Sequence, residues 1–309
     1  MIQLSGLRKE FDNLLAVDNL SVTIPAGEIY GLIGPNGAGK TTTLRIACGL
    51  LEPTGGQVRI NDVDVLADPE QARRHIGYLS DFFSVYEDLK VWEYLDYFAH
   101  AYKMPAHEIP GRVEEVIAEA GLESKRDTLI HGLSRGMKQR LGIARAMIHK
   151  PKVLLLDEPA SGLDPKARIE LRNLLRATRD QGSTILISSH ILTELEGLCT
   201  SIGIMERGRL IRTGKIEEVV AAGIEARLMK LQWIGDHQRG IQDLLSTFPA
   251  ITEIRLNTTE ADFRFTGTEE EQAQLLAQLI AQGVRVTTFR EIRQTVEEMY
   301  MKLSTHEVM

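Results

Sequence analysis

Up to about residue 223, the chain alternates short apolar runs with longer segments whose apolar residues recur at helical spacing. Runs typical of buried strands occupy residues 28–33, 153–156, 184–187 and 202–205. Parallel strands are covered on both faces, so their sequences are continuously apolar, and helices connect one strand to the next. The alternation therefore predicts an α/β domain.

The middle of this region differs, because it has helical periodicity and little strand signal. Its apolar residues recur at helical spacing twice, at Trp92, Leu95, Phe98 and Tyr102 and again at Val113, Val116, Ile117 and Ala120. Two amphipathic helices in succession predict a helical subdomain of about residues 82–149, inserted into the α/β core.

Beyond residue 223 the order of elements changes to βαββαβ. Strands are predicted at residues 227–234, 252–257, 262–266 and 284–289, and helices at residues 241–248, 269–282 and 295–303. This order predicts a small ferredoxin-like α+β domain over residues 224–309. One face of its long helix is expected to pack on the sheet, namely Leu275, Leu276, Leu279 and Ile280.

Composition narrows the possible functions. The 309 residues carry a formal net charge of −7, whereas nucleic-acid-binding proteins usually have a basic excess, so no nucleic-acid partner is expected. Cys48 and Cys199 belong to no metal-binding motif and are expected to be small buried residues. No stretch approaches the roughly 18 apolar residues of a transmembrane helix, so function at a membrane would require a partner.

The strongest local motif is GPNGAGKT at residues 34–41, which follows a predicted strand and opens a predicted helix. Glycines allow backbone N–H groups to surround phosphates, and the N-terminus of a helix adds positive potential. Lys40 is expected to reach the β- and γ-phosphates, and Thr41 to hold Mg²⁺ through its hydroxyl. The competing interpretation is a glycine-rich turn with a solvent-exposed lysine, which the flanking strand and helix disfavour.

A second motif, VLLLDEP at residues 153–159, is an apolar strand that ends in two acids. Parallel sheets bind ligands at the carboxyl ends of their strands. Asp157 can hold Mg²⁺ through water, and Glu158 can orient the attacking water or accept its proton. An apolar strand ending in Asp-Glu is common by itself, but a phosphate loop earlier in the chain favours a catalytic role for the two acids.

Between these motifs lies LSRGMKQR at residues 133–140, followed by an apolar helical face. The order of the three motifs resembles ATP-binding cassette (ABC) proteins, over roughly residues 1–223. In that family, Ser134 and the helix it begins would contact the γ-phosphate bound by a second subunit. A serine that caps a helix explains the same residue structurally, and the two roles are compatible.

The resemblance extends to further positions. It implies that SGLD at residues 161–164 lies across a dimer interface and that His190 contacts the γ-phosphate and the catalytic Glu158. It also implies that Phe11 stacks on adenine, for which an aromatic face is suited. The implied ATP-binding residues are Phe11, Val17, Gly34, Pro35, Asn36, Gly37, Ala38, Gly39, Lys40, Thr41, Thr42, Ser134, Arg135, Gly136, Met137 and Asp164.

Three positions, two of them in the signature, depart from the family's pattern. The signature has Arg135 and Met137 where the family usually has Gly and Gln, which adds a cation and removes an amide near the ribose. Asp81 stands where the family usually has the glutamine that links Mg²⁺ and the attacking water to the membrane subunit. A carboxylate there could bind Mg²⁺ with Thr41 and Asp157, or could slow hydrolysis.

Within the family, the likeness is to ATPase subunits of ABC-2 type export systems, which often carry an LS-x-GM signature and a C-terminal accessory domain. The resemblance implies a Mg²⁺-dependent ATPase that works as a head-to-tail homodimer. It also implies a separate integral-membrane permease subunit and a location on the cytoplasmic, inner face of the cell membrane.

Other nucleotide-binding classes fit less well. A GTPase would carry an N-K-x-D motif, and a chromosome ATPase would carry a long coiled coil between its halves; this chain has neither. A soluble ABC ATPase that acts on a cytosolic assembly is the remaining alternative, because the membrane-linked role follows from the resemblance and from no membrane signal in the sequence.

Overall fold

The computed structural model describes residues 1–83, 85–191, 194–195, 197–221 and 227–292. The chain divides into two units, Met1–Val219 and Val220–Met309. The helix predicted at residues 295–303 lies outside the described residues.

The centre of the first unit is a six-stranded sheet in the order β10-β9-β3-β8-β7-β6. Its strands are β3 (Ile29–Ile33), β6 (Ile76–Leu79), β7 (Val153–Asp157), β8 (Thr184–Ser189), β9 (Ser201–Glu206) and β10 (Arg209–Lys215). All neighbours pair in parallel except β9 and β10. The four strands predicted from continuous apolar runs correspond to β3, β7, β8 and β9 and are confirmed to within two residues at each end. Every residue of β3, β7 and β8 is buried, as expected for strands covered on both faces.

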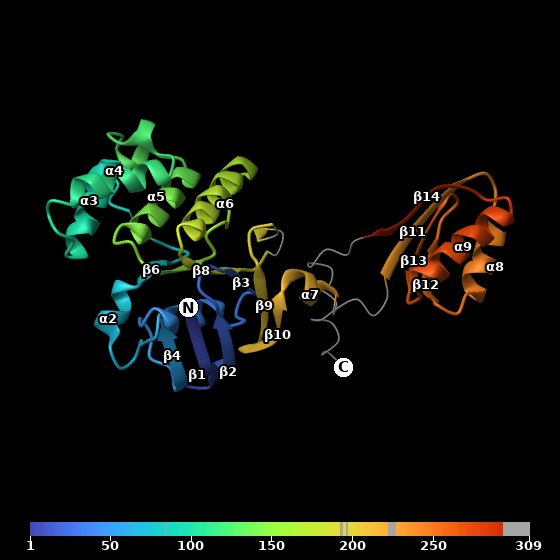
Figure 1. Ribbon diagram of the computed structural model, residues 1–309, viewed down its shortest axis with the longest axis horizontal. Coiled ribbons are helices and arrows are strands. Elements are labelled where there is room, and N and C mark those ends of the chain that lie inside the picture. The colour runs from blue at the N-terminus through green and yellow to red at the C-terminus, as the bar shows by residue number, and fades with distance from the viewer. Residues whose placement is uncertain (84, 192–193, 196, 222–226, 293–309) are drawn as a thin grey trace. The chain divides into compact units, whose positions relative to one another are not determined.

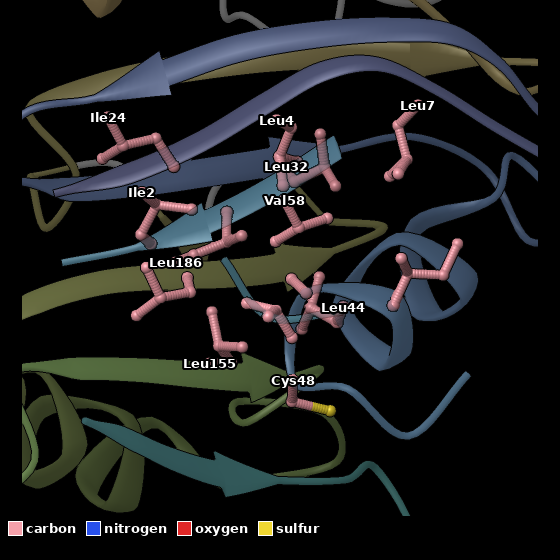
Figure 2. Packing of buried hydrophobic residues seen from close by; sticks show 14 of the residues in the cluster. Ile2, Leu4, Leu7, Ile24, Leu32, Leu44, Cys48, Val58, Leu155 and Leu186 are labelled. Carbon is pink, nitrogen blue, oxygen red and sulfur yellow. The ribbon is translucent and has the colours of Figure 1, made fainter. Parts of the chain in front are cut away.

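A second, antiparallel sheet was not anticipated from the sequence. It has the order β2-β1-β4-β5, with β1 (Ile2–Phe11), β2 (Leu14–Ile24), β4 (Gly55–Ile60) and β5 (Val63–Asp64). Figure 2 shows its apolar side chains facing Leu155 and Leu186 of the central sheet and Leu44 of α1 (Lys40–Ala47). The core that positions α1 therefore lies between the two sheets.

Helices α3 (Val91–Ala101), α4 (Ile109–Glu119) and α5 (Arg135–Met147) form a group with a core of its own, seen together in Figure 1. Two buried arginines join α4 to α5 reciprocally. Arg112 on α4 donates to the carbonyls of Met147 and Ile148 at the end of α5. Arg140 on α5 donates to the carbonyls of Ala120 and Gly121 just after α4. Each arginine satisfies carbonyl groups that the helix itself leaves unpaired.

The remaining elements of the first unit are short connections, apart from α6. They are α2 (Pro69–Arg74), η1 (Glu123–Lys125), η2 (Ile130–Gly132), α6 (Pro165–Asp180) and α7 (Ile216–Ala221). Cys48 and Cys199 are free and buried, as expected, and burial raises the pKa of each thiol to about 12. Among the described residues, no helix combines the length and apolar character needed to cross a bilayer.

The second unit is an antiparallel sheet in the order β12-β13-β11-β14. Its elements are β11 (Arg227–Ile234), α8 (Gln238–Thr247), β12 (Ile251–Leu256), β13 (Glu260–Phe265), α9 (Glu269–Ala281) and β14 (Arg285–Ile292). Leu275 and Leu279 are fully buried, as predicted for the face of α9 that meets the sheet. The prediction for Ile280 was wrong: it is 58% exposed, because one residue beyond Leu279 turns the side chain about 100° around the helix.

Candidate active site

The phosphate loop connects β3 to α1 along a path that requires glycine. Gly39 has φ 100°, a left-handed conformation that side chains disfavour. A Cβ atom at Gly39 would overlap the carbonyl oxygen of Ala16, and one at Gly34 would overlap that of Met205. The loop is therefore pressed against β2 and β9, and its backbone N–H groups at the start of α1 form a concave surface suited to an anion.

Lys40 is buried at the base of this loop, with 5% of its surface exposed. Its ammonium donates to the carbonyls of Gly34 at 2.7 Å and Pro35 at 3.1 Å. It also lies 3.4 Å from the Glu158 carboxylate. A buried cation needs such partners, and phosphate oxygens would be stronger ones than neutral carbonyls. The solvent-exposed lysine of the competing interpretation is thereby excluded.

Asp157 ends β7 and is almost completely buried. One of its carboxylate oxygens accepts hydrogen bonds from Ser188 at 2.6 Å and from Thr41 at 3.1 Å. These hard oxygens, next to a phosphate loop, are the ligands that Mg²⁺ prefers. No cluster of three or more His, Cys, Asp or Glu residues with metal-binding geometry occurs in the described part of the chain. A Mg²⁺ ion here would add phosphate and water oxygens to the side-chain oxygens at this edge of the cavity.

Glu158 is held in an uncommon backbone conformation, with φ 49°. Its N–H donates to Ser188 Oγ, and its carboxylate lies 2.7 Å from Nδ1 of His190. The backbone N–H of His190 also donates to that carboxylate. Such strain persists only where the surroundings enforce it, and here Ser188, His190 and Lys40 do so.

These groups line one cavity of about 420 Å³. Its lining residues are Phe11, Leu14, Ala16, Asn36, Gly37, Gly39, Lys40, Thr41, Thr42, Asp81, Glu158, Ser161 and His190. The structure thus brings Phe11, the loop, Asp81, Glu158 and His190 together. Leu14 and Ala16 were not selected from the sequence, although their alternation in β2 next to Phe11 could have indicated them. Val17 points instead into the core, where it is fully buried.

The signature residues do not line this cavity. Ser134 is the N-cap of α5, and its hydroxyl accepts the N–H of Met137 at 3.3 Å. Asp164 caps α6 in the same way, by accepting the N–H of Ala167 at 2.8 Å. One chain therefore presents Ser134 to Met137 on a surface separate from its own phosphate loop.

Asp81 follows β6 and lies on the rim of the cavity. Desolvation raises its pKa, and the negative charges of Asp157 and Glu158 raise it further. Arg135 and His190 act in the opposite direction. The position therefore belongs to the same electrostatic cluster as the two acids that end β7.

A larger cavity of about 680 Å³ lies between Tyr102, stacked on His149, and the start of α4. Three of its cations are engaged in ion pairs: Arg112 and Lys150 share Glu115, and Arg74 pairs with Glu70. It contains none of the three sequence motifs, so its size does not make it the active site.

Residues 17–161 match the family model described as ABC transporter. The chain is 34% identical over 308 residues to Nod factor export ATP-binding protein I of Cupriavidus metallidurans. That alignment covers 100% of this chain and 98% of the relative. The chain belongs to the ABC transporter ATP-binding proteins. An uncharacterized ABC transporter ATP-binding protein of Bacillus subtilis is 31% identical to this chain, and the alignment covers 98% of this chain and 96% of the relative.

Solved structures of ABC cassettes have the same fold. The ATP-binding subunit of an ABC transporter matches with a TM-score of 0.65 and 31% identity, covering 72% of this chain and 92% of that one. A dimeric ATP-binding cassette in a post-hydrolysis state, bound to ADP and Pi, matches with a TM-score of 0.62 and 26% identity. It covers 70% of this chain and 99% of that cassette. The chain is thus an ABC ATPase with an ATP-binding function in transport.

Proposed function

We propose that this ABC ATPase hydrolyses MgATP at two composite sites of a head-to-tail homodimer and thereby powers a separate membrane subunit. The observation that carries the proposal is the convergence of Lys40, Glu158 and His190 on one cavity, with Asp157 bonded to Thr41 of its lining, while residues 134–137 do not line it. A site with a phosphate loop and no γ-phosphate contact from its own signature needs a second chain to complete it.

Catalysis begins with an exchange of partners at Lys40. The ammonium leaves the carbonyls of Gly34 and Pro35 for the β- and γ-phosphates of ATP, where it balances negative charge. Glu158 then loses the Lys40 ammonium as its ion-pair partner and is free to orient the attacking water or accept its proton. His190, 2.7 Å from that carboxylate, holds it in place and is positioned to contact the γ-phosphate.

Mg²⁺ would be held by Thr41, Asp157 and Asp81 at the edge of the cavity, where it would neutralise phosphate charge. The hydroxyl of Thr41 already lies 3.1 Å from Asp157, so the two oxygens are gathered on one side. Asp81 adds a third oxygen on the rim of the same cavity.

The dimer places Ser134 and Gly136 of each chain against the ATP of its partner. The position of Ser134 at the N-terminus of α5 supports this, because backbone N–H groups and helix polarity attract a γ-phosphate. Asp164 and the loop before it would lie across the interface. The solved cassette bound to ADP and Pi is dimeric, and this chain is 26% identical to it.

The membrane subunit would dock on the helical subdomain, near residues 82–102. Phe82 is 91% exposed there, and a cavity of about 630 Å³ is lined by Val85, Tyr86, Glu87, Asp88, Leu89 and Tyr97. We infer export from the relatives named for Nod factor export, and with it a position on the cytoplasmic face of the cell membrane. The second unit would be a ferredoxin-like accessory domain, which its strand order supports.

The test is Glu158→Gln, which keeps the shape of the side chain and removes its charge. Turnover should fall by roughly 100-fold or more, as expected when a general base is lost. ATP should convert the variant to a stable dimer, measured by size-exclusion chromatography with light scattering. The matched control is Glu70→Gln, at a carboxylate 75% exposed on α2. Normal turnover of Glu158→Gln would remove Glu158 from its catalytic role.

Gentle solubilisation of native membranes with tagged protein distinguishes the transporter from the soluble alternative. A stoichiometric integral-membrane protein should co-purify with the ATPase. Recovery with cytosolic proteins alone would move the function to a soluble assembly and leave the ATPase assignment intact.

A further inference from the structure

In the signature turn (residues 134–137), the side chain of Arg135 reaches the loop of residues 161–164. Its guanidinium donates to the carbonyl oxygen of Ser161 at 2.9 Å. It also fills the space beside Gly162, where a Cβ atom would overlap the guanidinium. Gly162 has φ 67°, so the loop passes under Arg135 in a conformation that glycine favours.

The loop that Arg135 contacts belongs to the cavity of its own chain. Ser161 lines that cavity together with Lys40 and Glu158. Arg135 therefore links the signature turn to the rim of the cavity in the same chain.

The backbone beneath this contact is firmly packed. The starts of α5 and α6 adjoin so closely that a Cβ at Gly136 would lie 2.7 Å from the Cβ of Ala167. Ser134 and Asp164 each cap their own helix and do not bridge the two. Arg135 is thus a side chain of the signature turn that crosses to the loop before α6, and a glycine at this position could not make the contact.

We propose that Arg135 is a positioning residue that fixes the loop of residues 161–164 relative to the signature turn. Binding of one nucleotide by Ser134 and Gly136 is thereby transmitted to the other cavity, whose rim contains Ser161. This proposal rests on the proposed function, because it requires two composite sites. It adds a specific side chain that couples them.

The test compares Arg135→Met, which keeps length and helix propensity but removes the donors, with Arg135→Lys, which keeps one charged donor without the planar fork. Arg179→Ala is the matched control: it lies near the end of α6 and pairs with the surface residue Asp180. Two quantities are measured on the full chain: amide hydrogen exchange over residues 159–164 without nucleotide, and ATP turnover at varied ATP concentration.

In Arg135→Met, exchange over residues 159–164 should quicken roughly 3- to 10-fold, as expected for a lost charged hydrogen bond near the surface. The kcat should fall by a similar factor, KM should change less than about twofold, and the Hill coefficient should approach one. Arg135→Lys should lie between Arg135→Met and the parent chain, and Arg179→Ala should match the parent in both measurements.

Unchanged exchange in Arg135→Met would overturn the proposal, as would faster exchange with unchanged kcat and Hill coefficient. A parent chain that hydrolyses no ATP would overturn the proposed function and this coupling together. The exchange measurement would then still report whether Arg135 holds the loop, so the two failures are distinguishable.

Discussion

The cavity edge of the first unit and the sheet of the second unit follow different rules. At the cavity, Lys40 and Asp157 are buried charges, and Glu158 has a strained backbone. In β11, by contrast, the residues alternate regularly: Met229 and Leu231 face the core, and the intervening Lys230 pairs with an acid on the opposite face. The sheet of the second unit follows the alternation of apolar and polar residues in its sequence, whereas the cavity edge of the first unit does not.

The second unit does contain a left-handed residue, Glu253, with φ 51°. It lies at an irregularity in the pairing of β12 with β13, on an exposed edge strand. A bulge explains this conformation without any ligand. Glu158 has no such local reason, and each of its side-chain neighbours is a charged or ionisable group of the cavity. A strained backbone conformation therefore points to a catalytic role only where ionisable side chains of a site surround the residue.

The largest expected effect breaks the cavity and leaves the second unit unchanged. Lys40→Met removes the cation that binds the β- and γ-phosphates, so turnover should fall by roughly 100-fold or more, with ATP affinity lost as well. Folding should survive, because Glu158 retains His190 as a partner. The measurements are phosphate release and ATP binding by calorimetry. ATP affinity equal to that of the parent chain would contradict this role of Lys40.

The next effect breaks the second unit and leaves the cavity unchanged. Phe263 on β13 is fully buried in a core cluster confined to the second unit. Phe263→Ala should lower the free energy of unfolding of that unit by about 3–5 kcal/mol. Calorimetry should show one transition shifted to lower temperature, with ATP affinity unchanged. A parallel loss of ATP affinity would show that the two units are energetically coupled.

The smallest effect concerns Asp81. Its pKa is raised in the folded chain above the ordinary 3.8, so the folded state binds the proton more readily than the unfolded state. The resulting stability is present below that ordinary pKa and is lost as the pH rises through the raised value. Asp81→Asn should therefore be slightly more stable than the parent at pH 7, and the difference should disappear towards pH 3. Urea unfolding at both pH values measures it.

The rate of ATP turnover gives a second test of Asp81. If the Asp81 carboxylate restrains hydrolysis by its charge, Asp81→Gln should raise basal turnover several-fold, because the amide keeps an oxygen and removes a negative charge beside Glu158. Phosphate release over a range of Mg²⁺ concentrations tests this. Identical kinetics would show that Asp81 neither binds the metal nor holds back the reaction.

Much of the fold followed from the sequence, because buried parallel strands have continuously apolar sequences. The runs that became β3, β7 and β8 were located within two residues of their ends. The antiparallel sheet was missed, since its strands β1 and β4 lie far apart in the sequence and the pairing of β1 with β2 contains several irregularities. The prediction of which α9 side chains face the sheet failed at Ile280, because hydrophobicity alone does not show which of two adjacent apolar residues points inward.

The site could be predicted as a set of residues but not as an arrangement. Glycine spacing and the apolar strand before Asp157 indicated the phosphate loop and Glu158, the family resemblance indicated Phe11, Asp81 and His190, and Leu14 and Ala16 were missed. Nothing in the sequence indicated that Glu158 is left-handed, or that the Gly39 turn presses on Ala16, because both depend on contacts between distant segments. The contact of Arg135 with Ser161 has the same origin, although each residue was prominent in its own motif.

The reciprocal arginines of α4 and α5 bear on how these two helices can move relative to each other. Arg112 and Arg140 fasten each helix to the far end of the other, and Arg140 also pairs with Glu170 on α6. These contacts resist sliding of α4 along α5. Under the proposed function, a phosphate bound at the N-terminus of α5 would therefore move α4 and α5 together.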